Sequence, residues 1–230
     1  MKVKNGQTLL FMGDSITDCG RAHPVGMHSG LGEGYVAFVS SLLAACYPQE
    51  RVRVLNRGIS GDRVTDLKAR WQADVLDLKP NWLSVMIGIN DVWRQFDNVL
   101  DPDQVAIDRY ETVYRELLEQ TDQKLDGLVL MSPYLLEPDP NDPMRQQMDA
   151  YRRRVSNLSA EFGAEFVDVQ RAFDAYLSHR PASTLSDDRV HPNKTGHMII
   201  AAAFLRAIGF DWYSIKPSAI RASPGAHSRR

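Results

Sequence analysis

The stretch Thr8-Leu9-Leu10-Phe11-Met12-Gly13-Asp14-Ser15 near the start of the chain decides the fold. Its first five residues are a continuous apolar run, and Gly13-Asp14 ends that run. A short apolar run without alternation is typical of a β-strand that is covered on both faces. Four later runs share this length and character, at residues 51–56, 82–88, 127–132 and 164–169. The sequence therefore predicts five buried strands.

Amphipathic segments separate these runs. In each segment, apolar residues recur every three or four positions, which places them on one face of a helix. The segments fall within residues 35–46, 64–78, 107–118, 144–162 and 199–205. Strands that alternate with helices predict a parallel sheet, and right-handed crossovers then place helices on both of its faces. The expected fold is a doubly wound α/β/α sandwich with a five-stranded parallel sheet, similar in layout to flavodoxin.

Length and composition indicate an ordinary globular protein. The chain has 230 residues, of which 43% are hydrophobic and 24% charged. We expect one domain over residues 1–211, followed by a basic, proline-containing tail over residues 212–230. The 27 Lys and Arg residues against 29 Asp and Glu residues give a net charge of -2, so no basic excess indicates a nucleic-acid partner.

The lengths of the apolar runs also indicate where in the cell the protein is located. None approaches the roughly 18 residues of a membrane-spanning helix, and the first is shorter than the roughly 7–15 residues of a secretory signal. Cys19 and Cys46 form no metal-ligand pattern, and the histidines show no metal spacing. We therefore expect a cytoplasmic protein with two free thiols, no membrane association and no metal site.

Ligands of such folds bind at the carboxyl ends of the strands, where Gly13-Asp14-Ser15 lies. A serine hydroxyl at this place can act as a nucleophile once a base takes its proton. Taken alone, the tripeptide favours another interpretation, in which Ser15 is a helix N-cap and Asp18 lies in an acidic first turn.

A base is available near the end of the chain, in Asp188-Arg189-Val190-His191-Pro192. A catalytic histidine needs a carboxylate that fixes its tautomer and stabilises its charged form. Asp188 can reach His191 across a loose turn, and Asp187 is an adjacent alternative. Standing alone, this segment also fits an ordinary surface Asp and His.

Two further loops follow predicted strands. The first contains Gly58-Ile59-Ser60-Gly61, and the second contains Gly88-Ile89-Asn90-Asp91. Gly61 can offer an unhindered backbone N–H and Asn90 an amide donor, which are the groups that stabilise the oxyanion of acyl transfer. Each loop alone also fits ordinary turn chemistry.

These four blocks, in this order, resemble the GDSL family of esterases and lipases, also called SGNH hydrolases. The resemblance spans about residues 8–209. The stretches 11–20 (FMGDSITDCG), 85–95 (VMIGINDVWRQ) and 188–198 (DRVHPNKTGHM) resemble the bacterial acetyl xylan esterase branch in particular.

The resemblance implies a role for each block. Ser15 would be the nucleophile, His191 the general base and then acid, and Asp188 the residue that orients His191. The oxyanion donors would be the backbone N–H groups of Ser15 and Gly61 and the side chain of Asn90. The implied reaction is two-step acyl transfer from a small ester, and it needs no cofactor.

The expected substrate is a carbohydrate ester such as an acetylated xylo-oligosaccharide. Asp14, Trp93, Arg94 and Tyr134 are the candidate substrate contacts, since a tryptophan can form a platform for a sugar ring. Trp93 fits a core position equally well. The apolar residues of the tail, Trp212, Tyr213 and Ile215, further predict a homo-oligomer.

Two other functions remain open at this stage. One is a broad-specificity carboxylesterase or lysophospholipase that uses the same three residues. The other is a flavodoxin-like module that binds a phosphate or a nucleotide at residues 13–17, at the N-terminus of a helix. The carboxylate of Asp14 argues against the second function, because it would repel a phosphate.

Overall fold

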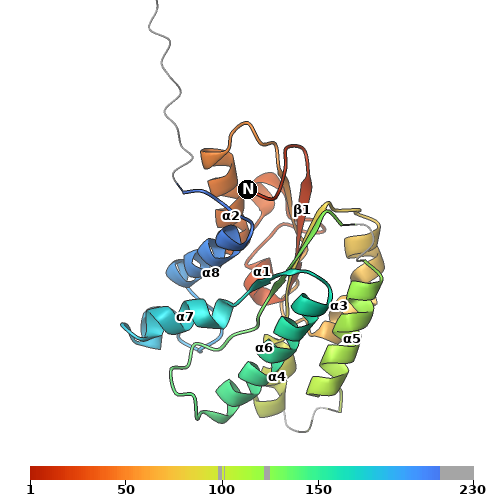
Figure 1. Ribbon diagram of the computed structural model, residues 1–230. Coiled ribbons are helices and arrows are strands. Elements are labelled where there is room, and N and C mark those ends of the chain that lie inside the picture. Colours follow the sequence, from red (N-terminus) through yellow and green to blue (C-terminus); the bar gives the residue numbers. More distant parts are fainter. Residues whose placement is uncertain (98–99, 101, 122–124, 213–230) are drawn as a thin grey trace, which may run out of the picture.

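Five parallel strands form the centre of the computed structural model, which describes residues 1–212 apart from 98–99, 101 and 122–124 (Figure 1). The strands lie in the order β2-β1-β3-β4-β5, and every neighbouring pair is parallel. Their bounds are β1 Thr8–Gly13, β2 Arg53–Asn56, β3 Trp82–Met86, β4 Gly127–Met131 and β5 Glu165–Val167. The predicted doubly wound α/β fold is confirmed.

Helices cover both faces of this sheet. The α-helices are α1 Ser15–Asp18, α2 Tyr35–Cys46, α3 Val64–Trp71, α4 Ile89–Asp97, α5 Ile107–Glu119, α6 Pro143–Glu161, α7 Val169–Leu177 and α8 Lys194–Ala207. Helix α2 packs against α8, which also contacts α7, whereas α3, α5 and α6 pack together across the sheet (Figure 1). Short helical turns η1 His28–Gly30 and η4 Ala182–Thr184 lie in loops, and a π-helix, η2 Gln72–Leu76, continues α3.

The five amphipathic segments correspond to α2, α3 with η2, α5, α6 and α8. The amphipathic pattern did not predict three helices: α1, α4 and α7. Each has nine residues or fewer and begins within three residues of the end of a strand, so its apolar residues merge with the strand pattern. The four later predicted strands are longer than the observed ones, most of all at 164–169, where only Glu165–Val167 form a strand.

The strand order creates the crevice for the site. The chain passes from β1 outward to β2, and then crosses back to β3 on the other side of β1. Such a reversal leaves the loops after β1 and β3 on opposite faces, which opens a crevice at the carboxyl ends of these strands. Gly13 at the end of β1 is in register with Met86 at the end of β3, so Ser15 and Asn90 both follow this edge.

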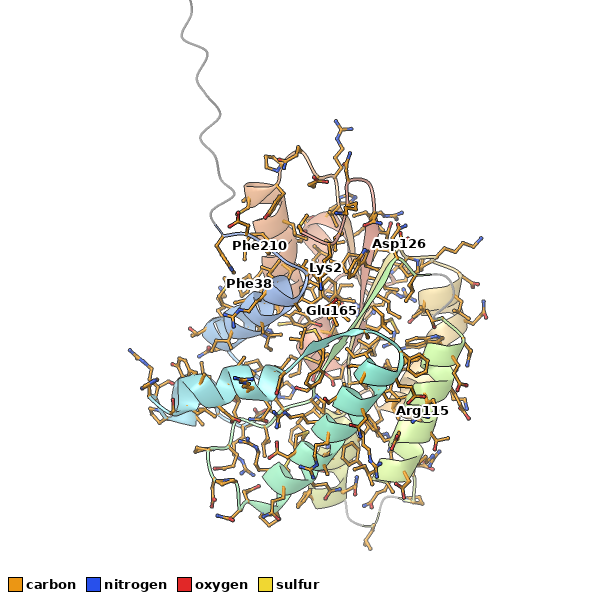
Figure 2. All side chains as sticks on the ribbon, viewed as in Figure 1. Lys2, Phe38, Arg115, Asp126, Glu165 and Phe210 are labelled. Carbon is orange, nitrogen blue, oxygen red and sulfur yellow. The ribbon has the colours of Figure 1, made fainter. Side chains whose placement is uncertain are left out.

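The N-terminal residues are attached to the end of α8 and to β5. The backbone N–H of Lys2 donates to the carbonyl of Ile208 at 2.7 Å, and the Lys2 ammonium pairs with Glu165 (Figure 2). Beyond α8, the ring of Phe210 contacts Tyr47 and Trp212, with centroids 5.3 and 4.9 Å apart. Trp212 is 44% exposed. The rest of the predicted tail, residues 213–230, lies outside the described residues.

Neither cysteine forms a disulfide; Cys46 is buried and Cys19 half-buried. Within the described residues, the structure has no helix that is long and apolar enough to cross a membrane.

Candidate active site

Ser15 is the first residue of α1, directly after β1. The helix is capped by Asp14, whose carboxylate accepts the backbone N–H of Ile16 at 3.0 Å. Ser15 is therefore not the N-cap, and its hydroxyl is available for another partner. Its Oγ lies 2.9 Å from Nε2 of His191, a residue 176 positions away in the chain. The tertiary fold thus brings the first and last of the four sequence blocks together.

The other ring nitrogen of His191 contacts Asp188. Nδ1 lies 2.6 Å from the Asp188 Oδ2, and the second carboxylate oxygen accepts the backbone N–H groups of Val190 and His191. An ionised carboxylate can only accept, so Nδ1 carries the proton and Nε2 is left to accept one from Ser15. Of the two aspartates considered, Asp188 rather than Asp187 makes this contact.

The Asp188 carboxylate is held ionised. Partial burial acts to raise its pKa, but the hydrogen bonds from the His191 ring, the two backbone N–H groups and the Ser186 hydroxyl outweigh it. The pKa of Asp188 therefore lies well below its ordinary value. An ionised Asp188 can fix the tautomer of His191 and stabilise an imidazolium if the ring takes a proton.

A second histidine, His197, lies close by but cannot serve as the base. It is 5% exposed, and its Nδ1 accepts the backbone N–H of Tyr35 at 3.2 Å. Its Nε2 lies 3.4 Å from the Cys19 sulfur. Burial, and next the nearby charge of His191, lower the pKa of His197 to about 4. His197 therefore stays neutral and is held between α1 and α2.

The three predicted oxyanion donors converge on the same edge of the sheet. Asn90 lies in the first turn of α4, not in a loop as predicted, and one of its amide hydrogens is donated to the carbonyl of Asp62 at 3.0 Å. An amide NH₂ has two donors, so the second hydrogen can serve a substrate. Gly61 precedes Asp62 and has a φ of +89°, a conformation that favours glycine. The N–H of Ser15 lies in the first turn of α1, where backbone donors have no partner within the helix.

The segment that carries Gly61 is also fixed from α4. Asp91, next to Asn90, accepts the backbone N–H of Val64 with both carboxylate oxygens, at 3.1 and 3.3 Å. Asn90 and Asp91 of α4 therefore bind Asp62 and Val64, the residues on either side of Arg63. This attachment sets the position of Gly61 relative to Asn90.

Residues of α1 and β2 hold the other end of that segment. The Asn56 amide donates to the carbonyls of Thr17 and Leu31, and its oxygen accepts the N–H of Gly58 at 2.9 Å. At Gly58 the loop runs against α1, because a Cβ there would lie 2.2 Å from the backbone nitrogen of Asp18. Neither Asn56 nor Asp18 was predicted as a site residue, since each has an ordinary position within a strand or a short helix.

Two carboxylates beneath the site are fully buried. Asp14 and Asp91 are 1% and 0% exposed. Burial raises the pKa of each to about 7, although backbone hydrogen bonds from Ile16 and Val64 respectively act in the opposite direction. Repulsion between negative charges also contributes, from Asp62 on Asp14 and from Asp14 on Asp91.

The four predicted substrate contacts divide into two pairs. Trp93 is half-buried on α4 with its ring 6.0 Å from that of His191, and the Arg94 guanidinium lies 5.0 Å from the Trp93 ring centroid. Asp14 and Tyr134 are instead buried, and both line a small space together with Ile16, Ile89 and Pro133. Tyr134 is 2% exposed and donates its hydroxyl to the carbonyl of Val190, so it supports the loop before His191.

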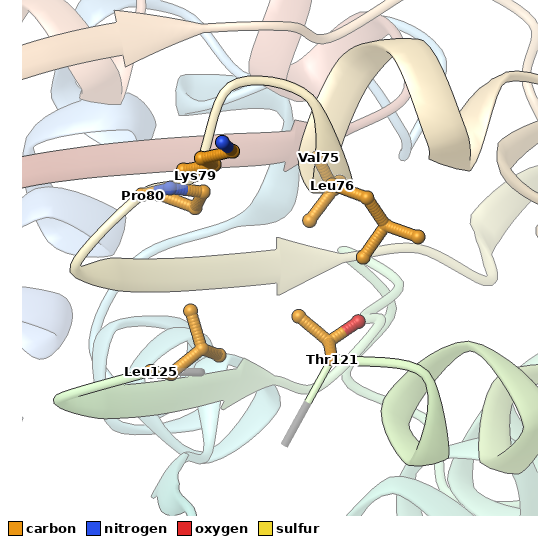
Figure 3. A pocket seen from close by; sticks show the side chains of 6 residues that line it. All are labelled: Val75, Leu76, Lys79, Pro80, Thr121 and Leu125. Carbon is orange, nitrogen blue, oxygen red and sulfur yellow. The ribbon is translucent and has the colours of Figure 1, made fainter. Parts of the chain in front are cut away.

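A cavity of about 330 Å³ lies elsewhere, at the amino ends of β3 and β4 (Figure 3). Its lining is mostly apolar and consists of Val75, Leu76, Lys79, Pro80, Thr121 and Leu125. It lies at the opposite edge of the sheet from Ser15 and brings no acid and base together. Among the described residues, no group of three His, Cys, Asp or Glu side chains could hold a metal ion.

A doubly wound sandwich in which a serine after β1 contacts a histidine, and the histidine an aspartate, is typical of hydrolases that use a serine nucleophile. The sequence model of the GDSL-like lipase/acylhydrolase family matches residues 11–199, and the chain belongs to this family. The predicted family is thereby confirmed.

Relatives cover almost the whole chain. The acetylxylan esterase of Geobacillus stearothermophilus is 51% identical over 215 residues, which are 92% of this chain and 98% of that protein. Its crystal structure, under the name Axe2, superposes with a TM-score of 0.91. LAE5, an α/β hydrolase from the metagenome of Lake Arreo in Spain, is 45% identical with a TM-score of 0.89, over 91% of this chain and 98% of its own.

Catalytic mutants of Axe2 have also been solved. In them a serine, an aspartate and a histidine are each replaced by alanine, and the aspartate lies three positions before the histidine.

Proposed function

We propose that this protein removes acetyl groups from xylo-oligosaccharides, with Ser15 as the nucleophile. The observation that carries the proposal is the continuous contact from Ser15 through His191 to Asp188, over 2.9 and 2.6 Å. The catalytic mutants of Axe2 support it, because they name the same three residue types with the same spacing between aspartate and histidine.

In the first step, the Ser15 oxygen attacks the ester carbonyl carbon while Nε2 of His191 takes the hydroxyl proton. The carbonyl oxygen becomes an oxyanion, which the N–H groups of Ser15 and Gly61 and the Asn90 amide stabilise. When the tetrahedral intermediate collapses, the bond to the sugar oxygen breaks and His191 returns the proton to that oxygen. The deacetylated sugar leaves, and the acetyl group remains on Ser15.

In the second step, water takes the place of the sugar. His191 removes a proton from the water as it attacks the acetyl carbonyl, and the same donors hold the new oxyanion. Collapse breaks the bond to Ser15, which regains its proton from His191, and acetate leaves. Asp188 remains ionised throughout, because its proton affinity is far too low to take the proton from His191.

The shape of the site favours a small acyl group on a large alcohol. The space lined by Ile16, Ile89, Pro133 and their neighbours has a volume of about 10 Å³, roughly that of one water molecule. By contrast, the side chain of His191 is 46% exposed. A bulky sugar can therefore approach His191 from solvent, whereas this small space suits a short acyl group.

Acetate release from acetylated xylo-oligosaccharides tests the proposal directly. We expect rapid release by the unmodified protein, none above background by Ser15→Ala, and slow hydrolysis of p-nitrophenyl octanoate and of a lysophospholipid. Faster turnover of the long-chain esters than of the acetylated sugars would instead favour the carboxylesterase or lysophospholipase function.

We also infer a homo-oligomer in which residues from Trp212 onward contribute to an interface. The exposed Trp212 ring, which packs edge-on against Phe210, supports this inference, because large exposed aromatic side chains are typical of interfaces. Truncation after Phe210 should then lower the mass measured by light scattering. An unchanged mass, or a monomeric full-length chain, would contradict it.

We infer a cytoplasmic location as well. Its support is that neither Cys19 nor Cys46 forms a disulfide, as is usual in a reducing compartment. Cell fractionation with an antibody against the protein would test it.

A further inference from the structure

A groove of about 260 Å³ opens beside His191, between α4 and the N-terminus of α6. Trp93 and Phe96 line it from α4, and Arg189 lines it from the loop that carries the base. Trp93 lies edge-on to the His191 ring at 6.0 Å, and Arg189 is two residues from His191 in the chain. The groove therefore begins where the alcohol part of an ester bound at Ser15 would lie.

The lining combines aromatic rings with charged groups. Phe96 is 41% exposed, and Asp97, Asp142 and Arg189 surround the apolar surface. A long acyl chain would have to cover these charges without hydrogen-bonding them, which costs free energy. A sugar has both kinds of surface that the groove requires: its C–H faces pack on aromatic rings, and its hydroxyls hydrogen-bond to charged side chains.

The charged groups are held in place before any ligand binds. Arg189 Nη1 donates to Glu137 at 2.8 Å and to Asp142 at 3.2 Å, and Asp142 also caps α6 by accepting the N–H of Arg145. Arg94, which lies over the Trp93 ring, is paired with Asp97. Side chains that are already ordered lose little further entropy on binding.

The Arg189 guanidinium keeps donors for a ligand. Its two contacts in the described part of the chain both involve Nη1, which leaves the N–H groups of Nε and Nη2. The volume lies just below the 300–1,000 Å³ typical of sites for drug-sized molecules, so it suits about one sugar ring.

We propose that this groove is a subsite for the sugar unit next to the acetylated one, with Phe96 as its platform and Arg189 as its hydrogen-bond donor. The proposal rests on the proposed deacetylase function and deepens it: the preferred substrate is an oligosaccharide rather than an acetylated monosaccharide. Phe96 is thereby a specificity-determining residue at a distance from the reacting atoms.

The test compares Phe96→Ala with Met198→Ala, a control on α8 whose residue is also 41% exposed. The measured quantity is the ratio of kcat/KM for acetylated xylotriose to kcat/KM for p-nitrophenyl acetate. Loss of one aromatic contact should lower this ratio about five- to tenfold in Phe96→Ala. Met198→Ala should leave it unchanged, and Phe96→Tyr should restore most of it.

Binding of unacetylated xylotriose, followed by NMR titration, separates this proposal from the deacetylase function. Weaker binding in Phe96→Ala than in Met198→Ala supports the subsite even if acetylated xylotriose proves a poor substrate, in which case only the deacetylase function fails. Rapid deacetylation with an unchanged ratio in Phe96→Ala overturns the subsite alone. Absence of xylotriose binding to the unmodified protein at millimolar concentrations overturns it as well.

Discussion

The carboxylate of Asp18 accepts two hydrogen bonds from Ser60, one from its backbone N–H at 3.1 Å and one from its hydroxyl at 2.9 Å. Asp18 is the last residue of the helix that begins at Ser15, and Ser60 directly precedes Gly61. A single short helix thus begins at the proposed nucleophile, and its last residue holds the residue that precedes the proposed oxyanion donor Gly61. We expect Asp18 to act as a positioning residue that does not itself touch the substrate.

Replacement of Asp18 by Asn should lower kcat for p-nitrophenyl acetate about ten- to a hundredfold, with a small change in KM. Asn has one oxygen and cannot accept from both Ser60 and Arg21 N–H, as the two oxygens of Asp18 do. The loss should stay below the 10²–10³-fold typical of a deleted oxyanion donor, because Gly61 is displaced rather than removed. Ser60→Ala is the matched control and should lose less, since it removes only the hydroxyl bond. Equal KM and kcat for Asp18→Asn and the unmodified protein would contradict the positioning role.

Asp188→Asn should reduce kcat by up to about 10⁴-fold, because an amide can leave the His191 tautomer wrong for taking a proton at Nε2. Asp187→Asn should cause a far smaller change, since its carboxylate is not the one on His191. Steady-state kinetics of the two variants measure the difference, and thermal unfolding of both checks that they are equally stable. Comparable losses would mean that Asp187 also acts on His191.

Asn90→Ala should lower kcat about 10²–10³-fold, equivalent to roughly 3–4 kcal/mol, and leave KM nearly unchanged. We expect the hydrogen bond from the amide to the substrate oxygen to be strongest in the transition state, when that oxygen is negatively charged. A thermal unfolding curve serves as the control, because Asn90 also bonds the carbonyl of Asp62. A rise in KM at constant kcat would show that Asn90 binds the ground state of the substrate instead.

Asp14→Asn should make folding stability less dependent on pH between about pH 4 and 7. With a pKa of about 7 in the folded protein, Asp14 keeps its proton in this range, whereas an unfolded aspartate with an ordinary pKa near 3.8 has lost it. The folded state then binds more protons, so the free energy of unfolding falls as pH rises through the window.

The neutral Asn cannot contribute to this fall, and it still provides an oxygen to cap Ile16. Urea unfolding at pH 5 and pH 8 measures the effect as the difference between variant and unmodified protein, which is of the order of 3 kcal/mol at most. The raised pKa of Asp91 also makes the free energy of unfolding fall with pH, in the variant as in the unmodified protein. The pH dependence in the variant should therefore be weaker but still present. Identical slopes would show that Asp14 is ionised in the folded protein at pH 5.

Most of the fold could be predicted from the sequence, because buried parallel strands and amphipathic helices have distinct periods of apolar residues. The prediction missed α4, because this helix has only nine residues and the polar Asn90 and Asp91 in its first turn interrupt the apolar pattern. Trp93 could be placed near the site, but the burial of Tyr134 could not be predicted, since burial of an aromatic ring depends on packing between distant segments. Asp18 carries no signal of its role in the sequence, because Ser60 is 42 residues away.

The hydrogen bond between Lys2 and Ile208 has a consequence for the engineering of this enzyme. Because the first residues and the end of α8 meet, a short linker from Phe210 to Met1 would close the backbone into a ring without disturbing the sheet. New ends could then be opened in an exposed loop such as the one at Asp139, far in sequence from Ser15 and His191. In such a circular permutant the histidine would precede the serine along the chain, while the distance between the two side chains stayed the same.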